Sequence, residues 1–503
     1  MLSSAPIRDT GKGVTIKPQH SDFARMQFEK NEAIAKLPIS KTTVIPRIQQ
    51  IKFSTPVIVK EIQGSRESQN LIAKIEKGFG TNFMKIDYIK SQNAKNTDES
   101  FEYGSPNFPK IIDFSKLKPD AGSQKSASRY VYVYARSWEQ LTMCMRALIS
   151  LAGQAKIGGR KLVEPFVKNS RFSGMDSWNS LGLYFNMKDM QRILKASGYA
   201  AFVEKKEYDA ECSAANNSSR AVIHFLYNAA KTVQYTKTHF GLTNEEYNII
   251  SKRAKVNGWT ECAFIEKKMK KLSGAKQFCV DPSVVTDWTL LERDVVRGAK
   301  CLTIYLWRGI GGGYRTYFSE NHAKIKTRDV LFALSPSIDI QKEVQRFKKD
   351  FLSGRYIAVQ VRGERVVMSH NLDHLRQCIN LLIKVIEALK KSANVSQVII
   401  ATDMSKFGSG SWSGSLKGES YDEHTLPDLH NSLVKNTGAV VYKATDNVDN
   451  GVVALVEMSL ISQAQHLITI GGGSFQEWIV AKFLESHRDD KQRLWSYIQM
   501  CSK

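Results

Sequence analysis

The spacing of apolar residues becomes regular near residue 129, where strand-like and helix-like patterns begin to alternate. Residues 130–135 (YVYVYA) are aromatic and β-branched, which is typical of a buried strand. Apolar residues then recur at helical spacing, at Leu141, Met145, Leu148 and Ala152. Two glycines stop this helix before a second strand at 161–163. A strand, a helix and a strand joined by short connections predict a parallel sheet.

The middle of the chain, residues 170–340, has a mixed pattern. It predicts helices at 221–233 and 244–255 and a buried strand at 302–307 (LTIYLW). The glycine-rich segment 309–314 (GIGGGY) follows that strand, but it lacks the spacing, the following helix and the ribose-binding acid of a dinucleotide site. We therefore do not expect a dinucleotide-binding loop there.

Strands and helices alternate clearly again from residue 355. Strands are expected at 356–361 (YIAVQV), 398–401, 439–442 and 467–470 (LITI). Helices are expected at 375–389 and 453–464, and a further helix opens at Ser474. Two α/β units separated by an insertion predict an α/β fold with two facing Rossmann-like domains. Ligands of such sheets lie in the crevice beyond the carboxyl ends of the strands.

Residues before 128 are polar and weakly periodic. Strand-like runs occur at 43–45 and 55–60, and the stretch 91–124 is typical of flexible or loop-rich chain. We therefore expect three parts: an N-terminal extension of unspecified fold (1–127), an N-terminal Rossmann-like domain with an insertion (128–340) and a C-terminal Rossmann-like domain (341–503).

Composition narrows the classes of protein. Hydrophobic residues make up 42% and charged residues 24%, as in folded soluble proteins. The net charge of +23, from 72 basic and 49 acidic residues, suits anionic partners, including phosphorylated small molecules. The basic residues are dispersed, however, and no nucleic-acid-binding motif accompanies them, so we expect no nucleic-acid partner. The seven cysteines include no C-x-x-C pair, which argues against a zinc ribbon.

Targeting signals are sparse. No run of 18 apolar residues occurs, so no transmembrane helix is expected. The first thirty residues lack the apolar segment of a secretory signal, so either the protein is cytoplasmic or the chain lacks its true start. Glycosylation sequons at Asn216, Asn217 and Asn394 are compatible with the secretory pathway, although sequons also arise by chance.

The strongest chemical signal is the segment 467–478 (LITIGGGSFQEW), where a buried strand leads through three glycines into a helix. Glycines let a backbone approach an anion closely, and the free N–H groups of the first helical turn point at it. Ser474 adds a hydroxyl donor. The alternative is a capping box between Ser474 and Glu477 that only stabilises the helix. Three consecutive glycines exceed the needs of a cap, which favours phosphate binding.

Three further side chains could contribute to such a site. Arg362 ends the strand 356–361, and its five donors suit a diphosphate that gains charge; the alternative is a surface pair with Glu364. Asp403 ends the next strand and could instead cap a helix. Glu457 could accept hydrogen bonds from guanine or be a solvated helix residue. No Walker loop, H-E-x-x-H, G-x-S-x-G or D-x-D motif occurs, so we expect neither a metal nor a cofactor.

Together these motifs resemble the fucosyltransferases of the GT-B superfamily, especially the protein O-fucosyltransferases. YIAVQVR, VIIATD and VEMSLISQAQHLITIGGGSF occur in the family's order. The resemblance implies that Arg362 holds the β-phosphate of GDP and assists departure of the diphosphate. It implies a GDP-fucose site in the C-terminal domain that includes Gln360, Arg362, Asp403, Glu457, Gly473, Ser474 and Phe475.

A looser match covers residues 129–168 and implies an acceptor-side domain. There Arg136 and Gln140 would line the cleft, with Arg136 among the donor-binding residues, and Glu139 would be the general base; a structural Arg136–Glu139 pair is the alternative. Two departures stand out. Gln360 replaces the usual histidine, and Gly363 replaces the second arginine of the α1,6-fucosyltransferase pattern.

The resemblance implies an inverting, metal-independent transfer of fucose from GDP-fucose to a hydroxyl of a protein or glycan, as in O-fucosylation and fucose metabolism. It also implies a location in the lumen of the endoplasmic reticulum or Golgi apparatus. Three alternatives stay open: a non-catalytic nucleotide-sugar- or glycan-binding protein of the same fold, an α1,6-type fucosyltransferase, and a basic nucleic-acid-binding protein.

Overall fold

The structure is a computed structural model. It describes residues 57–64 and 84–86 by their backbone, and with side chains residues 112, 114, 129–134, 140–212, 219–226, 237, 241–262, 274–285, 287–305, 325–404, 425–445, 448–487 and 495–501.

The N-terminal domain is built on a seven-stranded sheet with the order β7-β4-β3-β11-β8-β10-β9. Its strands are β3 (Tyr130–Val133), β4 (Lys161–Val163), β7 (Phe202–Val203), β8 (Arg220–Phe225), β9 (Trp259–Glu261), β10 (Lys276–Val280) and β11 (Cys301–Tyr305). Only β9 runs antiparallel to its neighbour among these described strands. The parallel sheet predicted from the first strand–helix–strand unit is confirmed.

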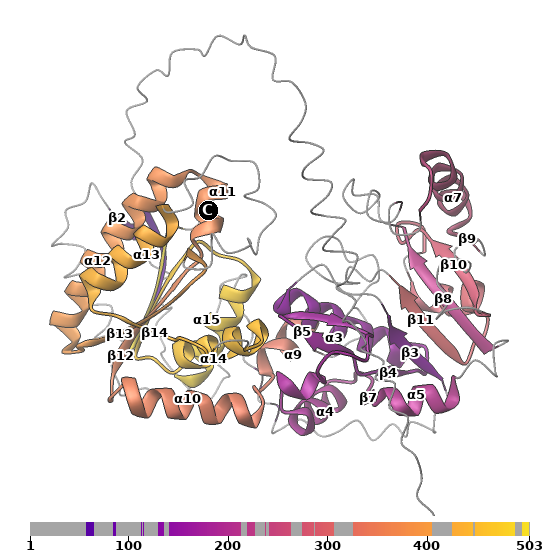
Figure 1. Cartoon of the computed structure of the whole chain (residues 1–503), viewed down its shortest axis with the longest axis horizontal. Coiled ribbons are helices and arrows are strands. Elements are labelled where there is room, and N and C mark those ends of the chain that lie inside the picture. Colours follow the sequence, from indigo (N-terminus) through magenta and orange to yellow (C-terminus); the bar gives the residue numbers. More distant parts are fainter. Residues whose placement is uncertain are drawn as a thin grey trace, which may run out of the picture. The chain divides into compact units, whose positions relative to one another are not determined.

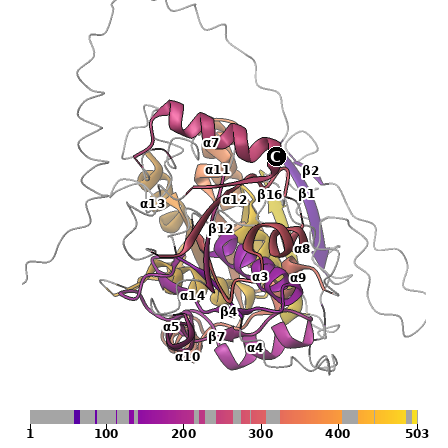
Figure 2. The same cartoon turned by 90° about the vertical axis from the view of Figure 1, so that its right-hand side faces the viewer.

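Helices and a small hairpin complete this domain, and Figure 2 shows α3 and α8 side by side. The elements are α3 (Leu141–Ile157), the hairpin β5 (Phe166–Lys168) and β6 (Arg171–Ser173), η1 (Leu181–Leu183), α4 (Met187–Ala196), α5 (Lys205–Glu211), α7 (Asn244–Asn257), α8 (Trp288–Leu290), the π-helical turn η5 (Leu291–Val296) and α9 (Thr327–Ala333). The helix expected at 221–233 is wrong in its described part. There the short apolar run RAVIHF forms β8, buried at every position between β11 and β10, and such a run has no periodicity that separates strand from helix.

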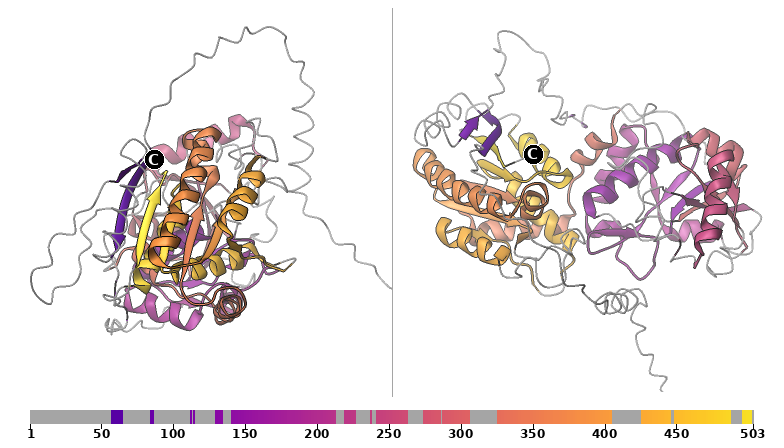
Figure 3. Two further views of the ribbon diagram at one scale, coloured as in Figure 1. Left: turned by 90° about the vertical axis from the view of Figure 1, so that its left-hand side faces the viewer. Right: turned by 90° about the horizontal axis from the view of Figure 1, so that it is seen from above.

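The C-terminal domain contains a second seven-stranded sheet with the order β14-β13-β12-β15-β16-β1-β2. Its strands are β1 (Val57–Gly64), β2 (Met84–Ile86), β12 (Tyr356–Val361), β13 (Gln397–Thr402), β14 (Val440–Val441), β15 (His466–Ile470) and β16 (Ser496–Met500). The last five are mutually parallel, whereas β1 pairs antiparallel with β16, as Figure 3 shows for the indigo and yellow strands. Two strands from the polar N-terminal segment therefore extend the C-terminal sheet.

Helices cover both faces of this sheet (Figure 1). One face carries α11 (Gly363–Ser369), α12 (Leu372–Ala393) and α13 (Thr425–Thr437), and the other carries α10 (Ile338–Phe351), α14 (Asn450–Ser462) and α15 (Ser474–Ser486). Side chains of β12 alternate between the two cores: Val359 and Val361 pack toward α12, while Ala358 packs in the core that contains α14 and α15. The predicted fold class, α/β with two Rossmann-like domains, is confirmed.

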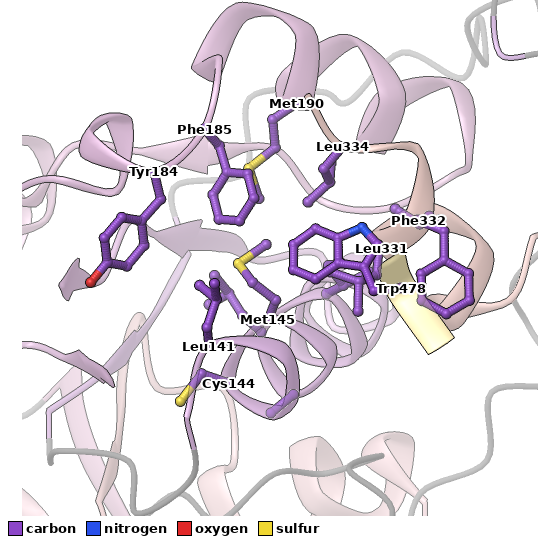
Figure 4. Close-up of a cluster of buried hydrophobic side chains, with 14 of the residues drawn as sticks. Leu141, Cys144, Met145, Tyr184, Phe185, Met190, Leu331, Phe332, Leu334 and Trp478 are labelled. Atoms are coloured by element: carbon purple, nitrogen blue, oxygen red, sulfur yellow. The ribbon is translucent and has the colours of Figure 1, made fainter. Parts of the chain in front are cut away.

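The hydrophobic core beneath α15 is continuous with that of the N-terminal domain. Figure 4 shows Trp478 of α15 beside Leu331 and close to Met145 of α3, and the rings of Trp478 and Phe185 stack with centroids 6.1 Å apart. Nearby, the Tyr184 hydroxyl donates to Asp449, the N-cap of α14. The position of α15 is thus fixed from both domains.

Six of the seven cysteines are paired in disulfides, which the sequence alone does not assign. The pairs are Cys212–Cys301, Cys262–Cys279 and Cys378–Cys501, and the remaining Cys144 is buried. Among the described residues, no helix combines the length and apolarity needed to cross a membrane.

Candidate functional site

The candidate site is formed where three neighbouring strands of the C-terminal sheet end. In the register of β12, β13 and β15, Val361 lies opposite both Thr402 and Ile470. Arg362, Asp403 and Gly471 are the next residues, so their backbones emerge side by side at the carboxyl edge. The Arg362 amide N–H also donates to the Ile470 carbonyl at 2.9 Å. The predicted convergence of the three strand ends is therefore present.

The three glycines bring the backbone unusually close to Arg362. Gly471, Gly472 and Gly473 have φ values of +102°, +106° and +112°, which residues with a side chain rarely adopt. A Cβ atom on Gly473 would lie 2.1 Å from Arg362 Nη1, and one on Gly471 would lie 2.6 Å from the Arg362 carbonyl oxygen. Arg362 Nη1 also donates to the Gly472 carbonyl at 3.4 Å. The guanidinium group therefore lies directly against the start of α15.

The helix α15 begins with unpaired amides. Gly473 is its N-cap and makes no side-chain cap bond, and the first backbone bond of the helix runs from the Glu477 N–H to the Gly473 carbonyl at 3.0 Å. The alternative of a Ser474–Glu477 capping box is therefore wrong, because Ser474 already lies inside the first turn. The amides of residues 474–476 have no acceptor among the described residues, and with the helix dipole they give this end a partial positive charge.

Gln476 braces the glycine loop, a role that sequence reasoning missed. Its Oε1 accepts from the Gly472 amide at 2.8 Å, and its Nε2 donates to Thr469 Oγ1 at 3.1 Å. Thr469 Oγ1 also lies 3.1 Å from the Tyr497 hydroxyl. A threonine inside LITI and a glutamine near the start of an apolar helix are the signal that could have indicated such a buried polar chain.

Asp403 supports the turn after Arg362. Its Oδ1 accepts from the Gly363 amide at 2.8 Å, at the N-terminus of α11, while its Oδ2 is buried without a partner among the described residues. Burial raises the pKa of this carboxyl to about 7, although the bond from Gly363 and the charge of Arg362 oppose the rise. The described contacts are thus those of the capping alternative, and contact with the nucleotide stays a prediction.

Gln360, near the end of β12, and Glu457, in the middle of α14, are both buried. Gln360 is 7% exposed between Ala401 and Thr469, and its Oε1 has no partner among the described residues. Glu457 on α14 is 9% exposed, so the alternative of a solvated helix glutamate is wrong. Ser474 and Phe475 are both half-buried at the start of α15.

The predicted general base lies outside the described residues, as does Arg136. Only the flanks of Glu139 are described: Tyr134 follows β3, its amide donating to the Ile304 carbonyl at 3.0 Å, and Gln140 is the N-cap of α3. The base role of Glu139 and the alternative Arg136–Glu139 pair both stay predictions. The glycine-rich segment 309–314 also lies outside the described residues.

Comparisons with known proteins give likenesses of fold alone. No protein-family model and no curated protein matches the chain. Solved structures similar to it include POFUT1 in complex with GDP-fucose (10% identity, 72% of this chain and 96% of that chain, TM-score 0.42). Another is the NodZ alpha-1,6-fucosyltransferase co-crystallised with GDP (14% identity, 70% and 91% covered, TM-score 0.33). A third is Se-Met NodZ from Bradyrhizobium (14% identity, 70% and 91% covered, TM-score 0.32). The two NodZ structures are those of a fucosyltransferase, and at these identities the likeness concerns the fold alone.

Proposed function

We propose that this protein is an inverting, metal-independent fucosyltransferase that moves fucose from GDP-fucose to a hydroxyl of a protein or glycan. The observation that carries the proposal is the position of the Arg362 guanidinium against Gly473, at the start of α15. A permanent cation and unpaired helix amides there converge on one point of the sheet edge. Such a combination suits a diphosphate.

The same groups would assist the chemistry. As the bond between fucose and the diphosphate breaks, negative charge grows on the departing phosphate oxygens. If Arg362 and the amides of 474–476 faced that phosphate, they would stabilise the transition state more than the bound donor. The Ser474 hydroxyl would add one donor, and Gln476 would keep the glycine loop in place through the Gly472 amide.

Nucleotide recognition would come from two buried polar side chains, Gln360 and Glu457. Glu457 would accept two hydrogen bonds from guanine, and Gln360 would use its unpartnered Oε1 near the base. Phe475 would contact the nucleotide through its ring. Asp403 would act through the Arg362–Gly363 turn that it holds, or would contact the donor directly.

The acceptor would approach from the N-terminal domain, with Glu139 as general base and Arg136 beside the donor. Proton removal by a carboxylate at the attacking hydroxyl is the step that an inverting transfer needs from this side. A secretory-pathway lumen is proposed as the location. Three disulfides support this because such bonds persist in oxidising compartments.

The α1,6-type alternative is disfavoured by packing at Gly363. A Cβ atom there would lie 2.6 Å from Met404 Cγ, so the second arginine of the α1,6 pattern does not fit without rearrangement. The non-catalytic alternative uses the same anion site and differs only in lacking transfer.

Thermal unfolding with added nucleotide tests the proposal. GDP should raise the melting temperature more than ADP or UDP does, equally with magnesium or with a chelator. Stabilisation by an oligonucleotide alone, with steep salt dependence, would favour the nucleic-acid alternative. Binding of GDP without any release of fucose from GDP-fucose, with or without acceptor glycans and proteins, would favour the non-catalytic alternative.

A further inference from the structure

A cluster of potential metal-binding side chains lies on the face of the C-terminal sheet that α12 covers, outside the proposed GDP site. His374 and Cys378 are four residues apart on α12 and therefore share one face of that helix. Cys501 directly follows β16. The ligand atoms of His374, Cys378 and Cys501 all lie within 4.8 Å of one another. Such a grouping of two sulfurs and an imidazole matches the ligands that zinc prefers.

A second imidazole lies next to this cluster. His370, at the end of α11, has its ring centroid 4.3 Å from that of His374. His370 is exposed and His374 is half-buried, whereas both cysteines are buried, so the cluster has one side open to solvent and one side held in the core. Structural zinc sites often combine two cysteines with two histidines. His370 contacts His374 ring to ring but is not in the group whose ligand atoms lie within 4.8 Å of one another, so it would have to turn toward the ion.

The two cysteines form a disulfide in the structure, with Cα atoms 6.3 Å apart. In this state neither sulfur is a thiolate, and only a thiolate binds a metal strongly. The other two disulfides serve as internal comparisons, because the described residues place no third ligand of this kind beside either of them.

We propose that His374, Cys378 and Cys501, with His370 as the fourth ligand, bind zinc once the Cys378–Cys501 disulfide is reduced. A dithiol reductant would supply two electrons and two protons to the disulfide and would itself become a disulfide. Zinc would then bind the two thiolates and displace both protons. In the reverse direction, a disulfide oxidant would take two electrons from the thiolates and release the ion.

The proposed zinc site and the proposed GDP site share no residue, but neighbouring residues of the same elements carry both. Met500, next to Cys501, pairs with Ile470, and Ile470 precedes the glycine loop. The helix α11, which ends at Ser369 beside His370, begins immediately after Arg362. The proposal stands on the ligand cluster alone and does not depend on fucosyl transfer.

Cobalt titration of the full chain tests the proposal. A phosphine reduces the disulfide to two thiols and is itself oxidised to the phosphine oxide, with the oxygen coming from water. Co²⁺ is then added under inert gas. We expect one equivalent of cobalt to give thiolate charge-transfer bands and the visible bands of a tetrahedral site, both removed by Zn²⁺. Cys501→Ser should lose about half of the thiolate charge-transfer intensity of this site, because only Cys378 Sγ remains as a thiolate ligand, and His374→Gln should weaken cobalt binding roughly tenfold or more because it removes a ligand.

The double variant Cys262→Ser/Cys279→Ser is the matched control and should keep the full cobalt signal. Absence of the bands in the reduced wild-type chain would overturn the proposal, as would bands that persist unchanged in Cys501→Ser or His374→Gln. Circular dichroism monitors the folding of each variant throughout the titration. Unfolding on reduction that one equivalent of zinc does not reverse would also overturn it, because zinc must stabilise the folded dithiol form.

Discussion

The guanidinium of Arg362 occupies the space where Gly473 would carry a side chain, since a Cβ atom there would lie 2.1 Å from Arg362 Nη1. One strand end thus supplies the cation, and the neighbouring strand end supplies a backbone without side chains that the cation can approach. The third glycine is required by this approach as well as by its own backbone angle.

Comparing Gly473→Ala with Gly472→Ala should separate the requirement for a positive φ from the requirement for close approach by Arg362. Both positions have positive φ, so each variant should lose roughly 1–3 kcal/mol of unfolding free energy. Only at Gly473 does the new methyl group meet Arg362, because a Cβ on Gly472 has nothing within 4 Å. Calorimetry should find GDP binding weakened more in Gly473→Ala. Equal GDP affinities in the two variants would contradict a role for this contact.

The raised pKa of Asp403 predicts a pH-dependent stability. The unfolded carboxyl ionises near its ordinary pKa of 3.8, whereas burial raises the folded pKa to about 7. The stability associated with the protonated group is therefore fully present below pH 3.8 and falls as the pH rises to about 7, by roughly 4 kcal/mol. Asp403→Asn keeps the acceptor for the Gly363 amide but does not titrate. Chemical denaturation between pH 4 and 8 should show a flatter dependence in this variant, and identical slopes would count against the assignment.

A buried ion pair in the N-terminal domain predicts a large loss of stability. Arg160 is 0% exposed, and its Nε and Nη2 donate to the carboxylate of Glu292 at 2.5 and 2.8 Å. Glu292→Ala would leave the buried guanidinium uncompensated and should cost about 3–5 kcal/mol of unfolding free energy. Asp294→Ala, in the same helical turn, breaks an exposed pair with Arg293 and should change little. Urea denaturation of the two variants compares them directly, and similar losses would refute this account of the core.

Glu139→Gln tests the proposed general base. The substitution preserves shape but removes the proton acceptor, so GDP binding should persist while transfer falls by roughly 10²–10⁴-fold. Calorimetry measures the first quantity, and release of GDP from GDP-fucose in the presence of acceptor measures the second. Transfer at an undiminished rate would assign the base role to another residue or to the substrate.

The C-terminal strands could be predicted because each short apolar run there is flanked by a segment with helical spacing of its apolar residues, which marks where the strand ends. The predicted strand 356–361 coincides with β12, and the helix expected from Ser474 begins at that residue. The pattern failed at β8, where six buried residues have neither helical nor alternating spacing. It also could not place β1 beside β16, because that pairing joins segments from opposite ends of the chain.

Within the site, residue positions could be predicted but their contacts could not. Arg362 and the glycines were found because strand ends and glycine runs are visible in sequence. Whether Ser474 or Gly473 caps α15 depends on backbone angles, and the positive φ of Gly473 decides it. The partners of Gln476 and Asp403 lie on neighbouring strands and turns that meet only in the folded sheet.

The most direct test of the central claim compares Arg362→Lys with the wild-type chain by calorimetry with GDP and by fucose release from GDP-fucose. Lysine keeps the charge but cannot reproduce the planar fork of donors against the glycine loop. Lost charge-assisted hydrogen bonds, at about 1.5–3 kcal/mol each, predict GDP binding weakened at least tenfold and transfer abolished, with the melting temperature of the free protein retained. GDP affinity and transfer at wild-type levels in Arg362→Lys would contradict the account.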